Sequence, residues 1–323
     1  MNVVTTDILG EPFTSETLVL PDDYEGPVTA TLVHSPAKTA ALRGAVLHLH
    51  GYCDYFFQTA QADFFTTLGF DFYAIDLRKY GRSLLPHQTP NFCLELSEYY
   101  PELDQALELI RGRDRHDRVL LSGHSTGGLI AALWAADRHR QRAPVGDALI
   151  LNSPWLDLAG RFYIRTAGTE AISRLGQRRP YAVVPRSVNG VYAETLHSDY
   201  RGEWTYDFAL KPRESFPVRA GWLRAMRLAH RTVHRGIETG MPVLTLCSAH
   251  SSGADSWSPD ADRTDTVLDV KQIAKWSHQL GRDVTLVRVH DAIHDVFCSR
   301  LDVRQAAFDS VERWLPYALG HPG

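Results

Sequence analysis

Short runs of apolar residues recur along most of the chain, each bounded by Gly, Asp or Pro. They are rich in Val, Leu, Ile and Phe and are too short to form free-standing helices. Runs of this kind are typical of strands buried on both faces of a parallel sheet. We therefore predict six buried strands: Ala45–His50, Phe70–Leu77, Arg118–Ser122, Ala148–Leu151, Val243–Cys247 and Val284–Val289.

Between these runs, apolar residues recur every three or four positions, which is the period of an amphipathic helix. This alternation predicts an α/β fold with a mostly parallel central sheet and helices on both faces. Before the first parallel strand, Glu16–Leu20 and Val28–His34 predict an antiparallel strand pair at one sheet edge. The predicted helices of the core are Thr59–Leu68, Ser97–Arg111, Thr126–Arg138, Val267–Leu280 and Val303–Leu315.

The alternation of strands and helices stops between Trp155 and about Thr239. Arg and aromatic residues crowd together in this segment, and four prolines interrupt it. An unstructured loop of this length is rare inside a compact domain, so we expect an inserted cap with helices at Gly168–Leu175 and Ala220–Thr239. The domain organisation is then a core at residues 1–154 and 240–323, with a mainly helical cap at residues 155–239.

The sequence Gly123-His124-Ser125-Thr126-Gly127-Gly128 stands directly between a predicted strand and a predicted helix. This is the G-x-S-x-G pattern in the strand–turn–helix context that a nucleophilic serine requires. Glycines permit a turn so sharp that a Cβ on either side of it would clash, and the serine is thereby exposed at the helix N-terminus. The alternative is a serine that merely caps a helix. The placement of the pattern favours Ser125 as a nucleophile.

A nucleophilic serine needs a base, and two histidines follow the last predicted strand. His290 is expected to end that strand. His294 lies farther along, in the loop that leads to the final helix, so it can reach over the carboxyl edge of the sheet where Ser125 is expected. A loop histidine is often simply solvated, but the presence of Ser125 favours His294 as the base.

The third member should be an acid between the serine and the histidine in sequence, after the strand Val243–Cys247. Most acids there are expected to be loop residues or helix caps. We choose Asp265, because it directly precedes the predicted helix Val267–Leu280 and so lies at the sheet edge near His294; its alternative role is an N-cap. The candidates in this stretch are Asp255, Asp260, Asp262, Asp265 and Asp269.

Acyl transfer also requires two hydrogen-bond donors for the oxyanion. The residue after the nucleophile supplies one, here the amide of Thr126, and the loop after the first parallel strand supplies the other. In that loop Gly51 lets the backbone approach the substrate closely, and we predict the amide of Tyr52 as the second donor.

We expect His50, Gly51, His124 and Phe56 to contribute to substrate binding, with Phe56 in an apolar wall beside the serine. His48 and His50 form an H-x-H pair, but no third ligand with suitable spacing accompanies them, so no metal is predicted. More simply, His48 is buried in its strand and His50 holds the loop by a hydrogen bond. Aromatic residues of the cap could line an acyl pocket or simply pack the insertion: Trp155, Phe162, Tyr163, Tyr181, Tyr192, Tyr200, Trp204, Tyr206, Phe208 and Trp222.

Composition narrows the class of partner. Apolar residues make up 44% of the chain and charged residues 22%. This apolar fraction is enough to form a buried core without disulfides or a structural metal. The formal net charge of -4 gives no electrostatic reason for a nucleic-acid partner. The four scattered cysteines are expected to be reduced thiols. The N-terminus lacks the pattern of a signal peptide, and no window is long and apolar enough for an integral membrane segment. We expect a cytoplasmic location and a small-molecule partner; the sequence gives no indication of oligomeric state.

The chain resembles α/β hydrolases of the group that includes serine aminopeptidase S33, monoacylglycerol lipase and lysophospholipase. The resemblance spans about residues 44–315. It implies an α/β-hydrolase fold, a triad of Ser125, Asp265 and His294, and a cap at the insertion. One departure is the loop Ser248–Arg263, since family members commonly place the acid in a short Gly-x-x-Asp turn. The motifs that carry the resemblance are His50-Gly51-Tyr52, Asp76–Ser83, Gly123–Gly128 and Ile293-His294-Asp295.

The predicted function is a serine hydrolase that cleaves carboxylic esters of a small or lipid-like substrate, in the manner of a carboxylesterase, lysophospholipase or monoacylglycerol lipase, without a cofactor. The same residues could serve an amide, as in an aminopeptidase, a thioester or a carbon–carbon bond. A ligand-binding protein without catalysis is a further alternative, although a binder has no need of a triad.

Overall fold

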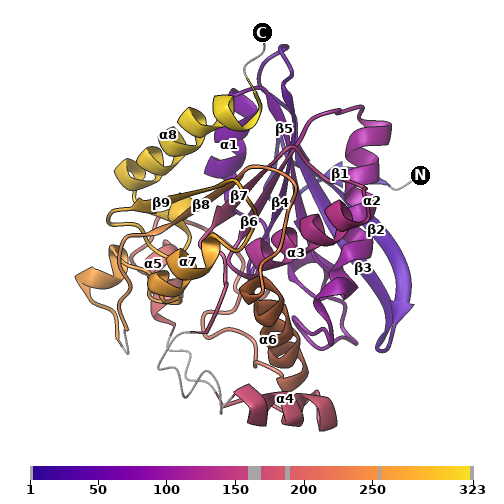
Figure 1. Ribbon diagram of the computed structural model, residues 1–323, viewed down its shortest axis with the longest axis vertical. Helices are drawn as coiled ribbons and strands as arrows, with labels where there is room; N and C mark the ends of the chain where they lie inside the picture. Colours follow the sequence, from indigo (N-terminus) through magenta and orange to yellow (C-terminus); the bar gives the residue numbers. More distant parts are fainter. Residues whose placement is uncertain (1–2, 159–168, 186–189, 254–255, 321–323) are drawn as a thin grey trace.

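The computed structural model describes residues 3–158, 169–185, 190–253 and 256–320. Within these ranges, nine strands form one mixed sheet in the order β1-β2-β3-β5-β4-β6-β7-β8-β9 (Figure 1). Strands β4 to β9 are parallel and are the six strands predicted from apolar runs, each within two residues of its expected ends. Five of them are largely buried as predicted, but β9 is the edge strand and is only partly buried. Their bounds are β4 Gly44–Leu49, β5 Phe70–Asp76, β6 Val119–His124, β7 Ala148–Asn152, β8 Val243–Ser248 and β9 Val284–Val289.

The antiparallel part of the sheet is larger than predicted. Strands β2 (Thr14–Asp23) and β3 (Gly26–Ser35) pair as expected, but β1 (Val4–Thr6) extends the sheet beyond them. The pair is therefore not the sheet edge. Because all three residues of β1 are exposed, this strand has no apolar pattern to reveal it. Pro21 lies inside β2, at a register shift where its missing N–H does not interrupt the ladder.

Helices cover both faces of the sheet, as predicted. Along β4, the side chain of Val46 packs with the cluster that includes α1 (Thr59–Thr67) and α8 (Leu301–Ala318). The side chain of Leu47 points the other way, into the cluster that includes α2 (Tyr100–Glu108), α3 (Thr126–Arg140) and α7 (Val270–Ser277). Figure 1 shows α1 beside α8, and the rings of Phe64 and Phe308 stack between them with centroids 4.5 Å apart.

Two predicted helices end or begin elsewhere. The stretch predicted at Ser97–Arg111 is a 3-10 turn, the helix α2 (Tyr100–Glu108) and a π turn (Leu109–Arg113). Helix α7 (Val270–Ser277) begins three residues later than predicted, because Asp269 caps it by accepting from the amide of Lys271 at 3.0 Å. Helix α3 (Thr126–Arg140) starts where expected.

The chain between β7 and β8, residues 153–242, is called the insertion here. Its described helices are α4 (Thr169–Arg178), α5 (Val191–Leu196) and α6 (Ala220–His234). Helix α6 begins at its predicted residue and ends five residues early, whereas α5 was not predicted, and Gly168 lies outside the described residues. Helix α4 packs closely on α6, since a Cβ on Gly176 would lie 2.4 Å from Ala220 O. The domain boundaries at residues 155 and 239 stay a prediction.

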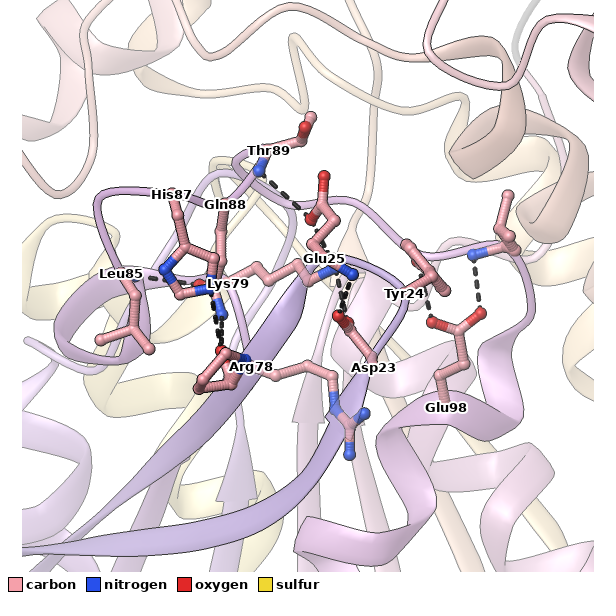
Figure 2. A network of polar contacts seen from close by, with 12 residues as sticks. Asp23, Tyr24, Glu25, Arg78, Lys79, Leu85, His87, Gln88, Thr89 and Glu98 are labelled. Atoms are coloured by element: carbon pink, nitrogen blue, oxygen red, sulfur yellow. Dashed lines mark hydrogen bonds and ion pairs between the residues drawn. The ribbon is translucent and has the colours of Figure 1, made fainter.

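Buried charges tie the turn after β5 to the β2–β3 hairpin (Figure 2). Lys79 is completely buried, and its Nζ lies 2.7 Å from Asp23 Oδ2 and 2.6 Å from Glu25 Oε2. The same ammonium lies 4.5 Å from the centre of the Tyr24 ring. A buried ammonium requires such partners because an isolated charge in the protein interior is costly. The hairpin tip is thereby fixed on the turn.

All four cysteines lie within the described residues, and each is buried and unpaired. No described helix combines the length and the apolar character needed to cross a membrane. The cytoplasmic location stays a prediction.

A buried ion pair also joins the turn after β5 to α2. Arg78 Nε and Nη2 donate to the two carboxylate oxygens of Glu102 at 3.0 and 2.7 Å. Burial raises the pKa of Glu102 above its ordinary value even though Arg78 opposes the shift. The carboxylate therefore depends on this one guanidinium for much of its compensation.

Replacing Arg78 by Met should lower the free energy of unfolding by about 3–5 kcal/mol, because it leaves a buried carboxylate uncompensated. Urea denaturation at neutral pH measures the change. The control is Lys38→Met, which removes an exposed pair with Asp63 at 2.9 Å and should cost less than about 1 kcal/mol. Equal losses in the two variants would contradict this account.

Candidate active site

Ser125 lies on a sharp turn between the end of β6 and the start of α3. Its φ of 52° and ψ of −116° fall in a region that L-residues rarely adopt. The Ser125 amide donates to Asn152 O at 2.9 Å, and Ser125 O accepts from the amides of Gly128 and Trp155. These backbone bonds hold the strained residue in place at the N-terminus of α3.

The glycines of the pattern are required because neighbouring backbone lies too close for a side chain. A Cβ on Gly123 would lie 2.8 Å from Gly127 O, and one on Gly127 would lie 2.2 Å from His50 O. Such distances are shorter than real Cβ contacts, so the predicted steric reason for the motif holds at both positions. The end of β4 is therefore pressed against the turn that carries Ser125.

The structure brings Ser125, His294 and Asp265 together in one hydrogen-bonded chain. Ser125 Oγ lies 3.0 Å from His294 Nε2, and Asp265 Oδ2 lies 2.8 Å from His294 Nδ1. All three residues are buried, with Ser125 the least so at 8% exposed. His290 directly follows β9 and is exposed.

Asp265 is held beside His294 by other contacts than the predicted position at the start of a helix. It does not adjoin α7; instead, its amide donates to His250 O at 2.9 Å and it forms a β-bridge with Ser251, which returns the long loop to the end of β8. Its Oδ1 accepts from the amides of Val267 and Leu268 at 2.8 and 2.7 Å. The carboxylate is thus fixed by backbone donors on one side and faces the imidazole on the other.

The other candidate acids have other places. Asp262 lies 3.2 Å from Arg300 in an ion pair, Asp269 caps α7, and Asp260 is exposed. Asp255 lies outside the described residues.

The loop that carries His294 is anchored by a buried network that the sequence analysis missed. Asn152 Nδ2 donates to Asp295 Oδ1 at 2.6 Å, and Asn152 Oδ1 accepts from the amide of Val296 at 3.0 Å. Burial alone would raise the pKa of Asp295, but the neighbouring His124 and the Asn152 amide hold it below its ordinary value. Because Asn152 O also accepts from Ser125, one residue at the end of β7 joins both loops. The sequence does contain a signal for this network: Asn152 is a polar residue at the end of an otherwise apolar strand.

His48 and His50 have separate structural roles. His48 Nδ1 lies 3.1 Å from Ser122 Oγ, and burial lowers the pKa of this imidazole to about 3. His50 Nε2 accepts from the amide of Leu77 at 3.0 Å, so its Nδ1 carries the proton that is donated to Gly51 O. Within the described residues, no group of three His, Cys, Asp or Glu side chains is placed to hold a metal ion.

A cavity of about 560 Å³ opens over Ser125 and His294. The backbone of Gly51 is close to the serine, since a Cβ on this glycine would lie 3.2 Å from Ser125 Cβ. Tyr52 and Thr126 both line the cavity beside Ser125. The amide of Thr126 is the first of α3, and the first amides of a helix have no acceptor within it. Both predicted donors are thus residues of the cavity wall.

Two of the four residues expected to bind substrate lie in the cavity wall and two do not. Gly51 and His124 line it, whereas the described wall does not include His50 or Phe56. Both ring nitrogens of His50 are taken up by backbone groups, and Phe56 is fully buried against Phe72. These two residues support the loop from behind, which corrects the expectation that they contact substrate.

Some aromatic residues of the insertion also line the cavity, whereas others do not. The rings of Trp155 and Trp222 stack in the cavity wall with centroids 5.6 Å apart, and Tyr192 also lines the wall, with its ring 5.5 Å from that of His294. Trp204 and Tyr206 instead pack onto Phe57 of the core and are not among the residues of the cavity wall. Phe162 and Tyr163 lie outside the described residues.

The family model for serine aminopeptidase, S33, matches residues 40–256, which is more than half of the chain. The chain belongs to this family. No curated protein sequence matches the chain at a significant level.

Solved structures similar to this S33-family chain have the α/β-hydrolase fold, which the chain shares. A soluble variant of monoglyceride lipase from Saccharomyces cerevisiae, in complex with a substrate analogue, has a TM-score of 0.67 at 16% identity, covering 93% of this chain and 94% of that one. Monoacylglycerol lipase of Paleococcus ferrophilus has a TM-score of 0.63 at 17% identity, covering 89% and 98%. Est1E from Butyrivibrio proteoclasticus, with bound ferulic acid, has a TM-score of 0.58 at 14% identity, covering 94% and 99%.

Replacing Gly127 by Ala should lower the free energy of unfolding by about 1–3 kcal/mol or more, because the new methyl group meets the backbone of His50. The control is Gly112→Ala, since a Cβ there meets nothing within 4 Å. That change should leave the protein equally stable or more stable by about 0.4–1 kcal/mol. Thermal and urea denaturation test both, and a Gly127→Ala protein as stable as the Gly112→Ala protein would refute the steric argument.

Proposed function

We propose that this chain is a serine hydrolase that cleaves carboxylic esters through an acyl-enzyme, with Ser125, His294 and Asp265 as its triad. The observation that carries the proposal is the hydrogen-bonded chain from Asp265 Oδ2 through the imidazole to Ser125 Oγ. A nucleophile, a base and an acid that orients the base are the groups that acyl transfer needs. Membership of the S33 family supports the same reading.

In the proposed reaction, His294 Nε2 takes the proton of Ser125 Oγ while this oxygen attacks the carbonyl carbon of the ester. The carbonyl oxygen becomes an oxyanion and accepts hydrogen bonds from the amides of Tyr52 and Thr126. The tetrahedral intermediate then collapses, His294 protonates the leaving alcohol, and an acyl group remains on Ser125. Water, activated by the same imidazole, repeats the sequence and releases the acid.

Asp265 sets the tautomer of the base. Because its carboxylate accepts from His294 Nδ1, the lone pair of the imidazole is on Nε2 and faces the serine. The bonds from the amides of Val267 and Leu268 leave the carboxylate little freedom to rotate. The acid therefore also stabilises the imidazolium that forms during attack.

The wall of the cavity favours an apolar acyl group. Its residues from the insertion and from the loop after Asp265 are mostly aliphatic or aromatic, and such walls suit an alkyl chain or an aromatic acid. The monoglyceride lipase structure holds a substrate analogue and the Est1E structure holds ferulic acid. We propose lipid-like or aromatic esters as the substrate class. These apolar residues include Trp155, Leu158, Val184, Val218, Trp222, Leu223, Val267 and Leu268.

Replacing Ser125 by Ala should abolish turnover of a chromogenic short-chain ester, with a loss of about 10⁶ in kcat, while leaving the fold intact. The same variant should fail to react with a fluorophosphonate probe, because only an activated serine does so. The control is Ser310→Ala on α8, where the hydroxyl bonds only within its helix. Wild-type turnover or labelling in Ser125→Ala would refute the proposal. Labelling of the wild-type protein without any ester turnover would favour an amide-specific hydrolase, whereas a wild-type protein that shows neither would favour a non-catalytic ligand-binding protein.

Replacing Asp265 by Asn should lower kcat by about 10⁴ with KM little changed, because the amide cannot hold the imidazole in the productive tautomer. Asp260→Asn is the matched control, since Asp260 is an exposed acid five residues earlier in the same loop. Steady-state kinetics at several pH values measure both variants. If Asp260→Asn caused the larger loss, Asp265 would not be the acid of the triad.

A further inference from the structure

The loop that carries Gly51 and Tyr52 contacts the insertion through its side chains. The ring of Tyr52 packs against that of Trp222 with centroids 4.1 Å apart, and Tyr52 Oη donates to Phe216 O at 3.4 Å. Both partners are residues of the insertion. The position of this core loop therefore depends on a segment that comes more than 150 residues later in the chain.

The carboxylate of Asp54 closes this loop and pairs with the insertion at the same time. Its Oδ2 accepts from the amide of Gly51 at 3.3 Å, and its Oδ1 accepts from Lys211 Nζ at 2.7 Å. Within this loop, between Gly51 and Asp54, Cys53 has a φ of 49°. This left-handed conformation is strained for any residue with a Cβ. A strained turn persists only when its surroundings hold it, and the Asp54 carboxylate is one of the groups that hold it here.

Both members of the Asp54–Lys211 pair are buried and charged. Their side chains are 2% and 10% exposed. Burial alone would raise the pKa of Asp54, but the Lys211 ammonium outweighs this effect and holds the pKa at about 2. The ammonium also lies 5.4 Å from the centre of the Phe57 ring and 5.6 Å from that of Tyr206. Removing the cation would leave an uncompensated carboxylate beside the oxyanion loop.

A cation in a cavity wall could instead bind an anionic group of a substrate. Lys211 lines the cavity, but its ammonium already bonds to the Asp54 carboxylate. A second anion would have to share that charge next to a fixed carboxylate, which repels it. The contacts of Lys211 therefore favour a role in holding the loop.

We propose that Lys211 is a positioning residue for acyl transfer: through Asp54 it fixes the Gly51–Cys53 turn, and with it the Tyr52 amide that stabilises the oxyanion. The inference rests on the proposed function. It makes the insertion part of the catalytic apparatus as well as the wall of the cavity. Lys211 acts on the donor that the transition state uses, so its removal affects the transition state more than the bound ester.

The test compares Lys211→Met with the wild-type protein in two ways. On a chromogenic short-chain ester, kcat should fall by about tenfold to a hundredfold with KM little changed, since a displaced oxyanion donor weakens the transition state. The affinity for a trifluoromethyl ketone, whose adduct with Ser125 carries an oxyanion, should fall by the same factor as kcat/KM. The affinity for an uncharged ether analogue of the ester, which has no carbonyl and forms no oxyanion, should stay unchanged.

The control is Glu203→Gln. It breaks a pair of Glu203 with Arg304 at 2.7 Å, which also joins the insertion to the core but is exposed and does not touch the oxyanion loop. This variant should keep wild-type kinetics. If Lys211→Met does not fold, the double variant Asp54→Asn, Lys211→Met replaces it, because it leaves no lone buried charge and keeps an acceptor for the Gly51 amide.

Wild-type kcat and ketone affinity in either folded variant would overturn the positioning role. A rise in KM with unchanged kcat would overturn it as well, in favour of substrate binding by Lys211. The proposed function is tested separately: activity in Ser125→Ala sinks it, whereas an inactive Ser125→Ala beside a fully active Lys211→Met sinks the positioning role alone.

Discussion

The hydrogen bond between Ser125 Oγ and His294 Nε2 joins two loops that are 169 residues apart in the chain. It can form because β6 and β9 are parallel members of one sheet, so that the loops after them meet at the same edge. Two further features bring the atoms within 3.0 Å of each other. The turn at Ser125 is forced outward by closely packed backbone, and Asn152 binds the serine amide with its carbonyl and the His294 loop with its side chain. The remaining parts of the site are arranged around this contact.

Those parts of the structure that follow from a local physical rule could be predicted from the sequence. Buried parallel strands leave continuous apolar runs, and a turn too tight for a Cβ leaves glycines on both sides of Ser125, so the parallel strands and the sharp turn at Ser125 could be predicted. Asp265 was selected for its nearness to a helix start, yet α7 begins at Val270. The structure places this carboxylate beside His294 for another reason, a bridge to Ser251 that closes a long loop. The residue was predicted, but the way in which it is held was not.

Contacts that depend on tertiary structure could not be predicted in this way. Lys211 reads as a solvated lysine among charged neighbours, and only its burial against Asp54, 157 residues earlier, reveals its role in the loop. His50 and Phe56 were expected to contact substrate, but neither residue lines the cavity. The reason is related, because the sequence alone does not determine where either side chain points. In the structure His50 turns to the amide of Leu77, and Phe56 turns into the core.

The fold is shared with lipases and esterases at 14–17% identity, whereas much of the cavity wall comes from the insertion. If the proposed function holds, the reaction depends on the shared fold and the choice of substrate on the insertion. In the proposed reaction, Ser125 becomes covalently acylated during turnover. The most direct measurement is mass spectrometry of the protein quenched while it hydrolyses an ester of known acyl mass. The expected result is one acyl group on the peptide that contains Ser125; turnover with an acyl group on any other residue, or with none at all, would contradict the proposed reaction.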